Sequence, residues 1–185
     1  MSPLMHHDFL SPQEMERSAS DLRSEVDWST IPVDPFVIAA RLEIDVLLGS
    51  FEDENVEGVL RTRNGRPEIL IREASNIARQ KFTIAHELGH HRLHWMRAEG
   101  PREDEENFVD DDMLLYRRGP ESGRPTDRED RNREIQANMF ASALLMPKDE
   151  VIRYAKDMKS VRAMANTFDV SEVAMRYRIG ELDVW

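Results

Sequence analysis

The fold of this chain is decided by the stretch Lys81-Phe82-Thr83-Ile84-Ala85-His86-Glu87-Leu88-Gly89-His90-His91. On a helix, His86 and His90 lie one turn apart on the same face, so both imidazoles can reach one metal ion. Glu87 lies one step round the helix and can face a water molecule beside the metal rather than the metal itself. The pattern His-Glu-x-x-His therefore predicts a helix that carries two metal ligands and a carboxylate general base.

A catalytic zinc site needs a third protein ligand besides two histidines. The chain has no cysteine, so this ligand must be a histidine, an aspartate or a glutamate. The best downstream candidate is Glu134, which lies on a second predicted helix and projects away from the apolar stripe of that helix. Asn138 follows one turn later and can orient a metal ligand through a hydrogen bond.

Two other histidines and an acidic segment offer alternatives to Glu134 as the third ligand. His91 points away from the face that the histidine pair shares, and His94 continues this face by one more turn, too far for the same ion. Acidic residues such as Asp112 are further candidates. The sequence alone therefore favours Glu134 without excluding the acidic segment.

The composition limits the class of protein. With 185 residues, 40% of them hydrophobic and 33% charged, the chain suits one domain with a hydrophobic core and a strongly solvated surface. No apolar run has the length of a bilayer and the N-terminus lacks the pattern of a secretory signal, so we expect a cytoplasmic protein without membrane contact. The net charge of −11 argues against broad DNA affinity but allows a basic protein partner.

Periodicity and capping residues predict an α+β fold in which a small antiparallel sheet packs on helices. The turn signal Asn64-Gly65 predicts a hairpin between strands at 56–60 and 68–71, with a further strand at 44–48. Helices are predicted at 11–24, 36–43, 76–95, 128–146, 148–158, 161–168 and 172–179. The first of them is polar, so we expect it to pack loosely.

The two helices that carry the candidate ligands each have an apolar face. For the first helix, with Ser75 as its predicted cap, the residues available for burial are Ile77, Phe82, Ala85, Leu88 and Leu93. For the second helix, with Asp127 as its predicted cap, they are Ile135, Met139, Phe140, Ala143 and Leu144. We expect both faces to lie in the hydrophobic core.

The chain divides into three expected parts. Residues 1–30 form an N-terminal helical extension, residues 31–147 form the core that carries the motif, and residues 148–185 form a C-terminal helical subdomain like a helix-turn-helix. Within the core, residues 97–126 are expected to be an acidic loop, since 99–112 contain eight acidic residues and one basic residue.

An ordered set of motifs gives the chain a family resemblance. The residues are Phe82-Thr83-Ile84-Ala85-His86-Glu87-Leu88-Gly89-His90, then Leu93-His94, then Glu134-x-x-Ala137-Asn138-x-Phe140-Ala141, then Leu144-Leu145-Met146-Pro147, and finally Phe168-Asp169-Val170-Ser171. Over about residues 30–180 the chain resembles the ImmA/IrrE family of zinc-peptidase-like proteins. This resemblance implies a zincin-like domain of the gluzincin type, with His86, His90 and Glu134 on the metal and Glu87 as the catalytic base.

The resemblance also implies a function. It points to an intracellular metallopeptidase, with zinc or alternatively manganese, that cleaves a helix-turn-helix repressor on a separate chain and derepresses mobile-element or stress-response genes. One alternative is a non-enzymatic regulatory or toxin–antitoxin component that keeps the fold, although such a protein has no chemical need for Glu87. Another is DNA reading by the C-terminal helix pair, which the seven basic and five acidic residues of 148–178 favour only weakly.

Overall fold

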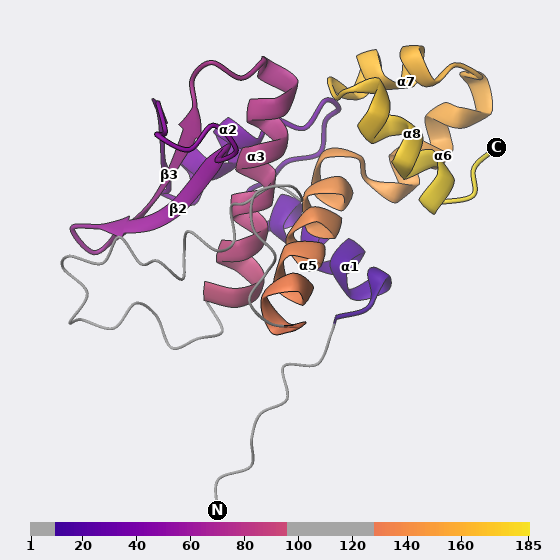
Figure 1. Cartoon of the computed structure of the whole chain (residues 1–185). Coiled ribbons are helices and arrows are strands. Elements are labelled where there is room, and N and C mark those ends of the chain that lie inside the picture. The colour runs from indigo at the N-terminus through magenta and orange to yellow at the C-terminus, as the bar shows by residue number, and fades with distance from the viewer. Residues whose placement is uncertain (1–9, 96–127) are drawn as a thin grey trace, which may run out of the picture.

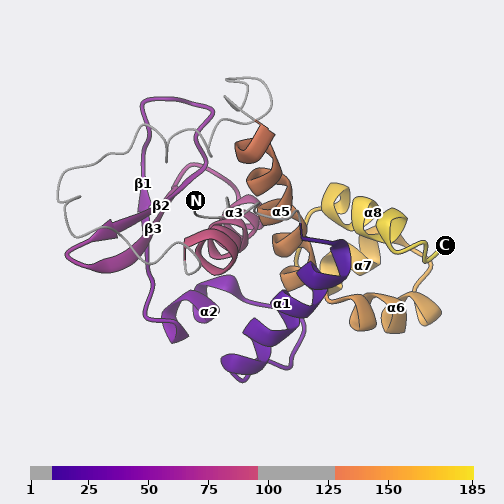
Figure 2. The same cartoon turned by 90° about the horizontal axis from the view of Figure 1, so that it is seen from below.

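The computed structural model describes residues 10–95 and 128–185, and the predicted acidic loop and the Asp127 cap lie outside these residues. Two helices that pack side by side, α3 and α5, form the centre of the molecule (Figure 1). The sheet lies on one side of this pair and three C-terminal helices lie on the other, while α1 runs along α5 (Figure 2). The α+β fold class expected from the sequence is confirmed.

The sheet has three strands, β1 (Asp45–Gly49), β2 (Gly58–Arg63) and β3 (Arg66–Arg72), in the order β1-β3-β2. β2 and β3 form the predicted antiparallel hairpin, and positive φ angles of 53° at Asn64 and 74° at Gly65 close its turn. β1 pairs with β3 in parallel, so the sheet is mixed and not antiparallel throughout. The reason is that the chain reverses twice between β1 and β3, which inserts β3 between the other two strands.

The N-terminal helix α1 (Pro12–Glu25) begins with a capping box between Ser11 and Glu14. Its residues Met15, Ala19 and Leu22 are buried, and the helix packs along α5. The expectation that this polar helix packs loosely is therefore wrong, because three apolar residues at helical spacing suffice to bury one face. A short second helix, α2 (Pro35–Arg41), is capped by Asp34, whose side chain accepts from the backbone N–H of Phe36.

The two central helices are α3 (Ile77–His90), which continues into the π-helical turn η1 (His91–Trp95), and α5 (Arg128–Leu145). Asn76 caps α3, one residue later than the predicted Ser75. The backbones of α3 and α5 approach closely at Gly89: a Cβ there would lie 3.2 Å from Cα of Ala137 and 3.1 Å from Cδ1 of Phe140. This contact brings the His-Glu-x-x-His turn against the helix that carries Glu134.

The expected core faces of the central helices are buried with two exceptions. Ile77, in the first turn of α3, is 55% exposed, and Ile135 of α5 is 41% exposed. The small residues Ala137 and Ala141 are fully buried instead, since a close helix–helix approach selects small side chains at the contact. The other predicted core residues are buried or partly buried, namely Phe82, Ala85, Leu88, Leu93, Met139, Phe140, Ala143 and Leu144.

The C-terminal part comprises α6 (Lys148–Asp157), α7 (Val161–Phe168) and α8 (Glu172–Glu181), close to the predicted boundaries. A three-residue turn joins α7 to α8, and Ser171 caps α8. The apolar sides of the pair meet through Met164, Phe168 and Met175, which are all buried. Within the two described segments, no helix combines the length and the apolar character needed to cross a bilayer.

Candidate metal centre

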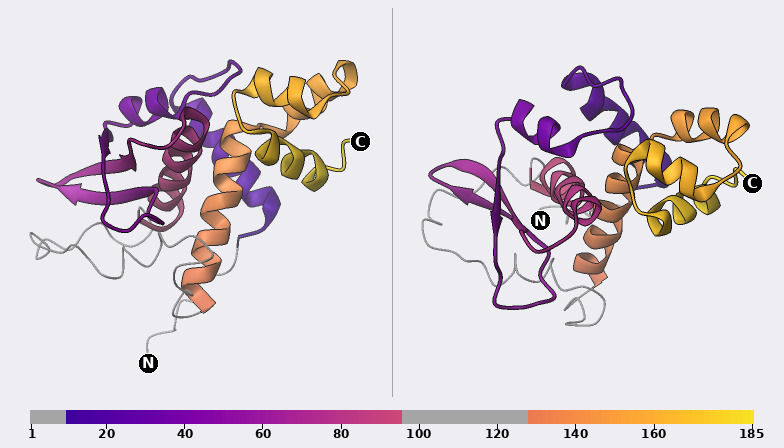
Figure 3. Two further views of the ribbon diagram at one scale, coloured as in Figure 1. Left: turned by 45° about the horizontal axis from the view of Figure 1, so that its top comes forward. Right: turned by 90° about the horizontal axis from the view of Figure 1, so that it is seen from above.

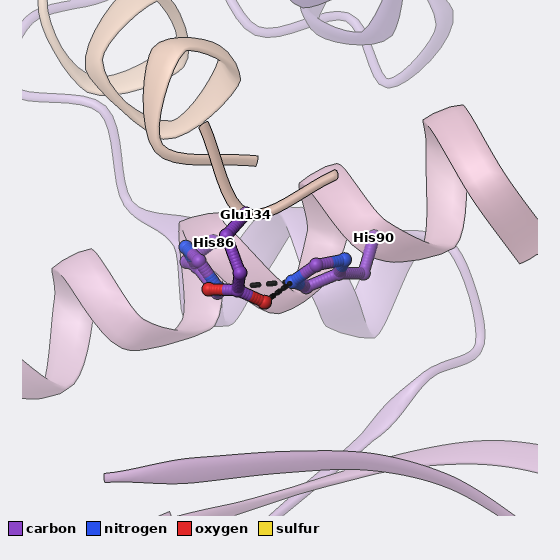
Figure 4. Close-up of side chains that lie close together, drawn as sticks. All are labelled: His86, His90 and Glu134. Atoms are coloured by element: carbon purple, nitrogen blue, oxygen red, sulfur yellow. Dashed lines mark hydrogen bonds and ion pairs between the residues drawn. The ribbon is translucent and has the colours of Figure 1, made fainter. Parts of the chain in front are cut away.

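Three side chains from the central helices converge at the contact between α3 and α5 (Figure 4). The Nε2 atoms of His86 and His90 lie 3.0 Å apart. The Glu134 carboxylate faces both rings, with one oxygen 3.4 Å from Nε2 of His86 and the other 3.1 Å from Nε2 of His90. The residue predicted from the sequence as the third ligand is thus brought next to the histidine pair.

The donor atoms and their spacing suit a divalent metal ion. A tetrahedral zinc with bonds of about 2.0–2.1 Å keeps its ligand atoms roughly 3.3 Å apart. The separations of 3.0, 3.1 and 3.4 Å, which join the two Nε2 atoms to each other and each of them to a different oxygen of Glu134, are near this value, and one ligand atom from each residue lies within 4.8 Å of the other two. Acceptor atoms at such distances repel one another unless a proton or a metal ion lies among them, so the group fits a metal.

The pKa values of His86 and Glu134 are shifted by their mutual contact. Burial lowers the pKa of His86, but Glu134 and Glu87 outweigh this effect and the pKa is raised. For Glu134, burial acts to raise the pKa, yet the contacts with His86 and His90 hold it at about 2. The carboxylate is therefore ionised at neutral pH and carries the negative charge that a divalent cation would meet.

Asn138 holds the ring of His86 from behind. Its Oδ1 lies 3.0 Å from Nδ1 of His86, so Nδ1 carries the proton and donates it to the amide oxygen. Nε2, which faces Glu134 and His90, is therefore the nitrogen of His86 available to a metal. Such support of a metal-binding histidine by a second residue is common in metal sites, and the sequence predicted it for Asn138.

Glu87 does not join the three converging side chains. It is 5% exposed and lies on the side of α3 that faces β2. A Cβ at Gly58 of β2 would lie 2.3 Å from Cγ2 of Thr83 and 3.2 Å from Oε1 of Glu87, so only glycine lets the strand approach this closely. The charge of Glu87 acts on His86, which places the carboxylate near the candidate ligands without making it one of them.

The other candidates have different surroundings. His94 lies in η1 with its ring centroid 5.6 Å from that of His90, and it does not belong to the converging group of the described residues. Asp112 lies outside the described residues. Arg178, which is chemically suited to stabilise an oxyanion, is buried between Glu16, Glu181 and the carbonyl of Met146, and nothing in the sequence indicated these partners.

Three further side chains that could stabilise an oxyanion lie in the C-terminal helices, namely Tyr154, Arg176 and Tyr177. The ring of Tyr154 packs edge-on against Phe168, with centroids 5.6 Å apart. Arg176 and Tyr177 are on the exposed side of α8.

Comparison with known proteins identifies the family. A family model described as the IrrE N-terminal-like domain, Peptidase_M78, matches residues 39–180. The chain belongs to this family. The resemblance to ImmA/IrrE proteins is thereby confirmed, and membership in a metallopeptidase family agrees with the His86, His90 and Glu134 group as a possible metal site.

The structural comparison supports the fold. A solved structure of a Mycobacterium tuberculosis transcriptional regulator matches with a TM-score of 0.60 and 17% identity, covering 90% of this Peptidase_M78 chain and 47% of the regulator. The chain thus spans about half the length of that regulator. No curated protein matches the sequence.

Proposed function

We propose that this Peptidase_M78 chain is a zinc endopeptidase that cleaves a helix-turn-helix transcriptional repressor, a separate and basic protein, in the cytoplasm. The convergence of three donor atoms from α3 and α5, in a chain of a metallopeptidase family, carries the proposal. His86, His90 and Glu134 would hold the metal. Zinc, when bound there, supplies the Lewis acidity that polarises a peptide carbonyl and makes water more acidic.

The protein residues then have distinct tasks. Asn138 keeps the Nδ1 proton of His86 in place and so keeps Nε2 available for the metal. Glu87 is the general base: its carboxylate accepts a proton from the attacking water and later donates this proton to the leaving amine. Burial of Glu87 and His90 protects the proton transfer from bulk solvent.

The sheet offers a way to hold the substrate. β2 is an edge strand of the sheet and approaches the Glu87 side of α3 at Gly58. An extended peptide can add to an open strand edge through backbone hydrogen bonds. A substrate segment bound along β2 would therefore lie beside Glu87, which explains why a strand precedes the motif-bearing helix.

The family and the charge of the chain support a repressor as the substrate. A structure similar to this chain is that of a transcriptional regulator, and a repressor that binds DNA is basic, which suits a chain with a net charge of −11. Cleavage of such a protein would derepress the genes it controls, which we expect to be mobile-element or stress-response genes.

The substitution Glu87→Gln tests the function. We expect it to lower the rate of repressor cleavage at least about a hundredfold, because it removes the base, while metal content stays close to wild type. The chain and the repressor encoded beside it are co-expressed, and the cleaved fragment and the bound metal are quantified by mass spectrometry. The exposed Glu54→Gln serves as the matched control. Cleavage by the Glu87→Gln chain at the wild-type rate would exclude the peptidase mechanism.

A further inference from the structure

The exposed side of α8 carries two large apolar side chains that the core does not use. Val173 is 64% exposed and Tyr177 is 78% exposed, although Met175 and Ile179 of the same helix are buried. Val173 and Tyr177 are four residues apart and lie on one face of the helix. We call this pair, together with Arg176 between them, the α8 face.

The α8 face has a fixed position relative to the candidate active site. Asp169, the left-handed C-cap of α7 in the turn before α8, forms an ion pair with Lys81 of α3. Lys81 is only 13% exposed and precedes His86 by five residues on the same helix. On its inner side α8 is attached by Arg178, whose Nε donates to the carbonyl of Met146 at 2.9 Å. A protein bound to the α8 face would therefore be held in a defined orientation to α3.

The chemistry of this face favours protein over nucleic acid. Among the exposed residues of α8, Arg176 is the single base and is accompanied by the acids Glu172 and Glu181. Binding to phosphates needs several basic residues, and the net charge of −11 opposes it further. An apolar centre with tyrosine and arginine and a charged rim is the composition of protein–protein interfaces.

Charge also selects among protein partners. Two copies of this chain would each bring a net charge of −11 and would repel one another. A basic protein is attracted instead by this net charge, while the two acids at the ends of α8 are themselves paired, Glu172 with Arg162 and Glu181 with Arg178. Figure 3 shows α8 on the side of the central helices that is away from the sheet, so a partner bound there would lie away from β2, which is an edge strand of the sheet within the described residues.

We propose that the α8 face is an exosite at which the basic repressor docks, separate from the segment that is cleaved. The proposal rests on the proposed function for the identity of the partner. Docking at α8 supplies affinity and specificity, while the scissile segment of the same molecule reaches α3 and β2.

A binding experiment tests docking independently of cleavage. The zinc-loaded Glu87→Gln chain is titrated with the purified repressor encoded beside this chain, and the Kd is measured by calorimetry. We expect Tyr177→Ala in this background to weaken binding about tenfold or more, and Tyr177→Phe, which keeps the ring, to restore it to within about threefold. Leu48→Ala on β1, where the side chain is 54% exposed, is the matched control and should bind like the parent.

Kinetics in the active chain separate docking from chemistry. Tyr177→Ala should raise KM for the intact repressor about tenfold with kcat unchanged, and should leave cleavage of a short peptide spanning the cut site unaffected. If the wild type binds the repressor through Tyr177 without cleaving it, the exosite stands and the peptidase function fails.

Three outcomes would overturn the exosite. The first is that the parent chain and Tyr177→Ala bind the repressor with equal affinity, or that neither binds it. The second is that the wild-type chain binds the operator duplex and Tyr177→Ala does not, which would show that α8 binds DNA. The third is dissociation of a homodimer by the same substitution, detected by analytical ultracentrifugation.

Discussion

Glu134 carries the charge that distinguishes the candidate metal centre from a simple histidine pair. Its pKa of about 2 shows how strongly the two imidazoles stabilise the carboxylate, and the same geometry would stabilise a divalent ion among the three donors. Removing the carboxylate leaves two neutral nitrogen donors, which do not complete a catalytic zinc site. Affinity for the metal therefore depends on Glu134 as much as on the motif.

We predict that Glu134→Ala lowers zinc affinity by more than about a hundredfold, since loss of a direct ligand exceeds the effect of losing a supporting residue. Affinity is measured by competition with a chromophoric chelator. The neighbouring Ile135→Ala, at a side chain that is 41% exposed, should bind zinc like the wild type. Equal zinc affinity in the two variants would remove Glu134 from the proposed ligand set.

Single residues of the site could be predicted where helical spacing alone determines their position. Predicting that His86 and His90 lie together required only that their segment be helical. Predicting Glu134 required a second helix on which this carboxylate lies outside the apolar stripe. The oxyanion-stabilising residue could not be predicted, because that choice depends on how the C-terminal helices pack. Arg178 illustrates the difficulty: it is 1% exposed and held by partners from α1 and α8 that are far apart in the sequence.

At the scale of elements, the spacing between α3 and α5 controls the centre. Gly89 allows this spacing, since a Cβ there would meet the backbone of Ala137 at 3.2 Å and backbone atoms cannot move aside independently. The ligands of α3 and α5 then share one point because the two helices touch one turn away from Glu134. A wider spacing would separate Glu134 from the histidines without changing any ligand.

We predict that Gly89→Ala destabilises the chain by about 1–3 kcal/mol through overpacking, although alanine favours a helix, and that it also weakens zinc binding. The control is Gly180→Ala in α8, where a Cβ would meet no atom within 4 Å. That variant should be neutral or more stable by up to about 1 kcal/mol. Chemical denaturation and chelator competition give the two quantities. A Gly89→Ala chain as stable as Gly180→Ala would show that α3 and α5 can tolerate a wider spacing.

Elements were predictable where the signals are local. Ser11, Asp34 and Ser171 cap helices as their sequence context predicts, and Asn64-Gly65 closes the hairpin. The parallel pairing of β1 was not predictable, since no short-range signal specifies which strand β1 joins. The buried face of a helix was also predicted wrongly where small residues make the contact. On α5 the small Ala137 is buried, whereas the large Ile135, which was expected in the core, is exposed.

At the scale of the whole molecule, α1 belongs to the same core as the candidate site although it precedes the matched family region. Met15, Ala19 and Leu22 are each 1% exposed, and Arg23 donates to the carbonyl of Ala143 at 3.2 Å. Glu16 forms an ion pair with the buried Arg178 of α8. The first helix therefore connects α5 with the C-terminal helices, and the three parts expected from the sequence share one hydrophobic core.

We predict that Leu22→Ala destabilises the entire molecule by about 2–5 kcal/mol, because it leaves a cavity between α1 and the rest of the core. Denaturation followed by tryptophan fluorescence and by circular dichroism should show one coincident transition at lower denaturant. Leu48→Ala, at a side chain that is 54% exposed on β1, should shift the midpoint little. If α1 were a separable extension, Leu22→Ala would leave the main transition and zinc affinity unchanged. A coincident shift instead means that α1 unfolds together with the rest of the molecule.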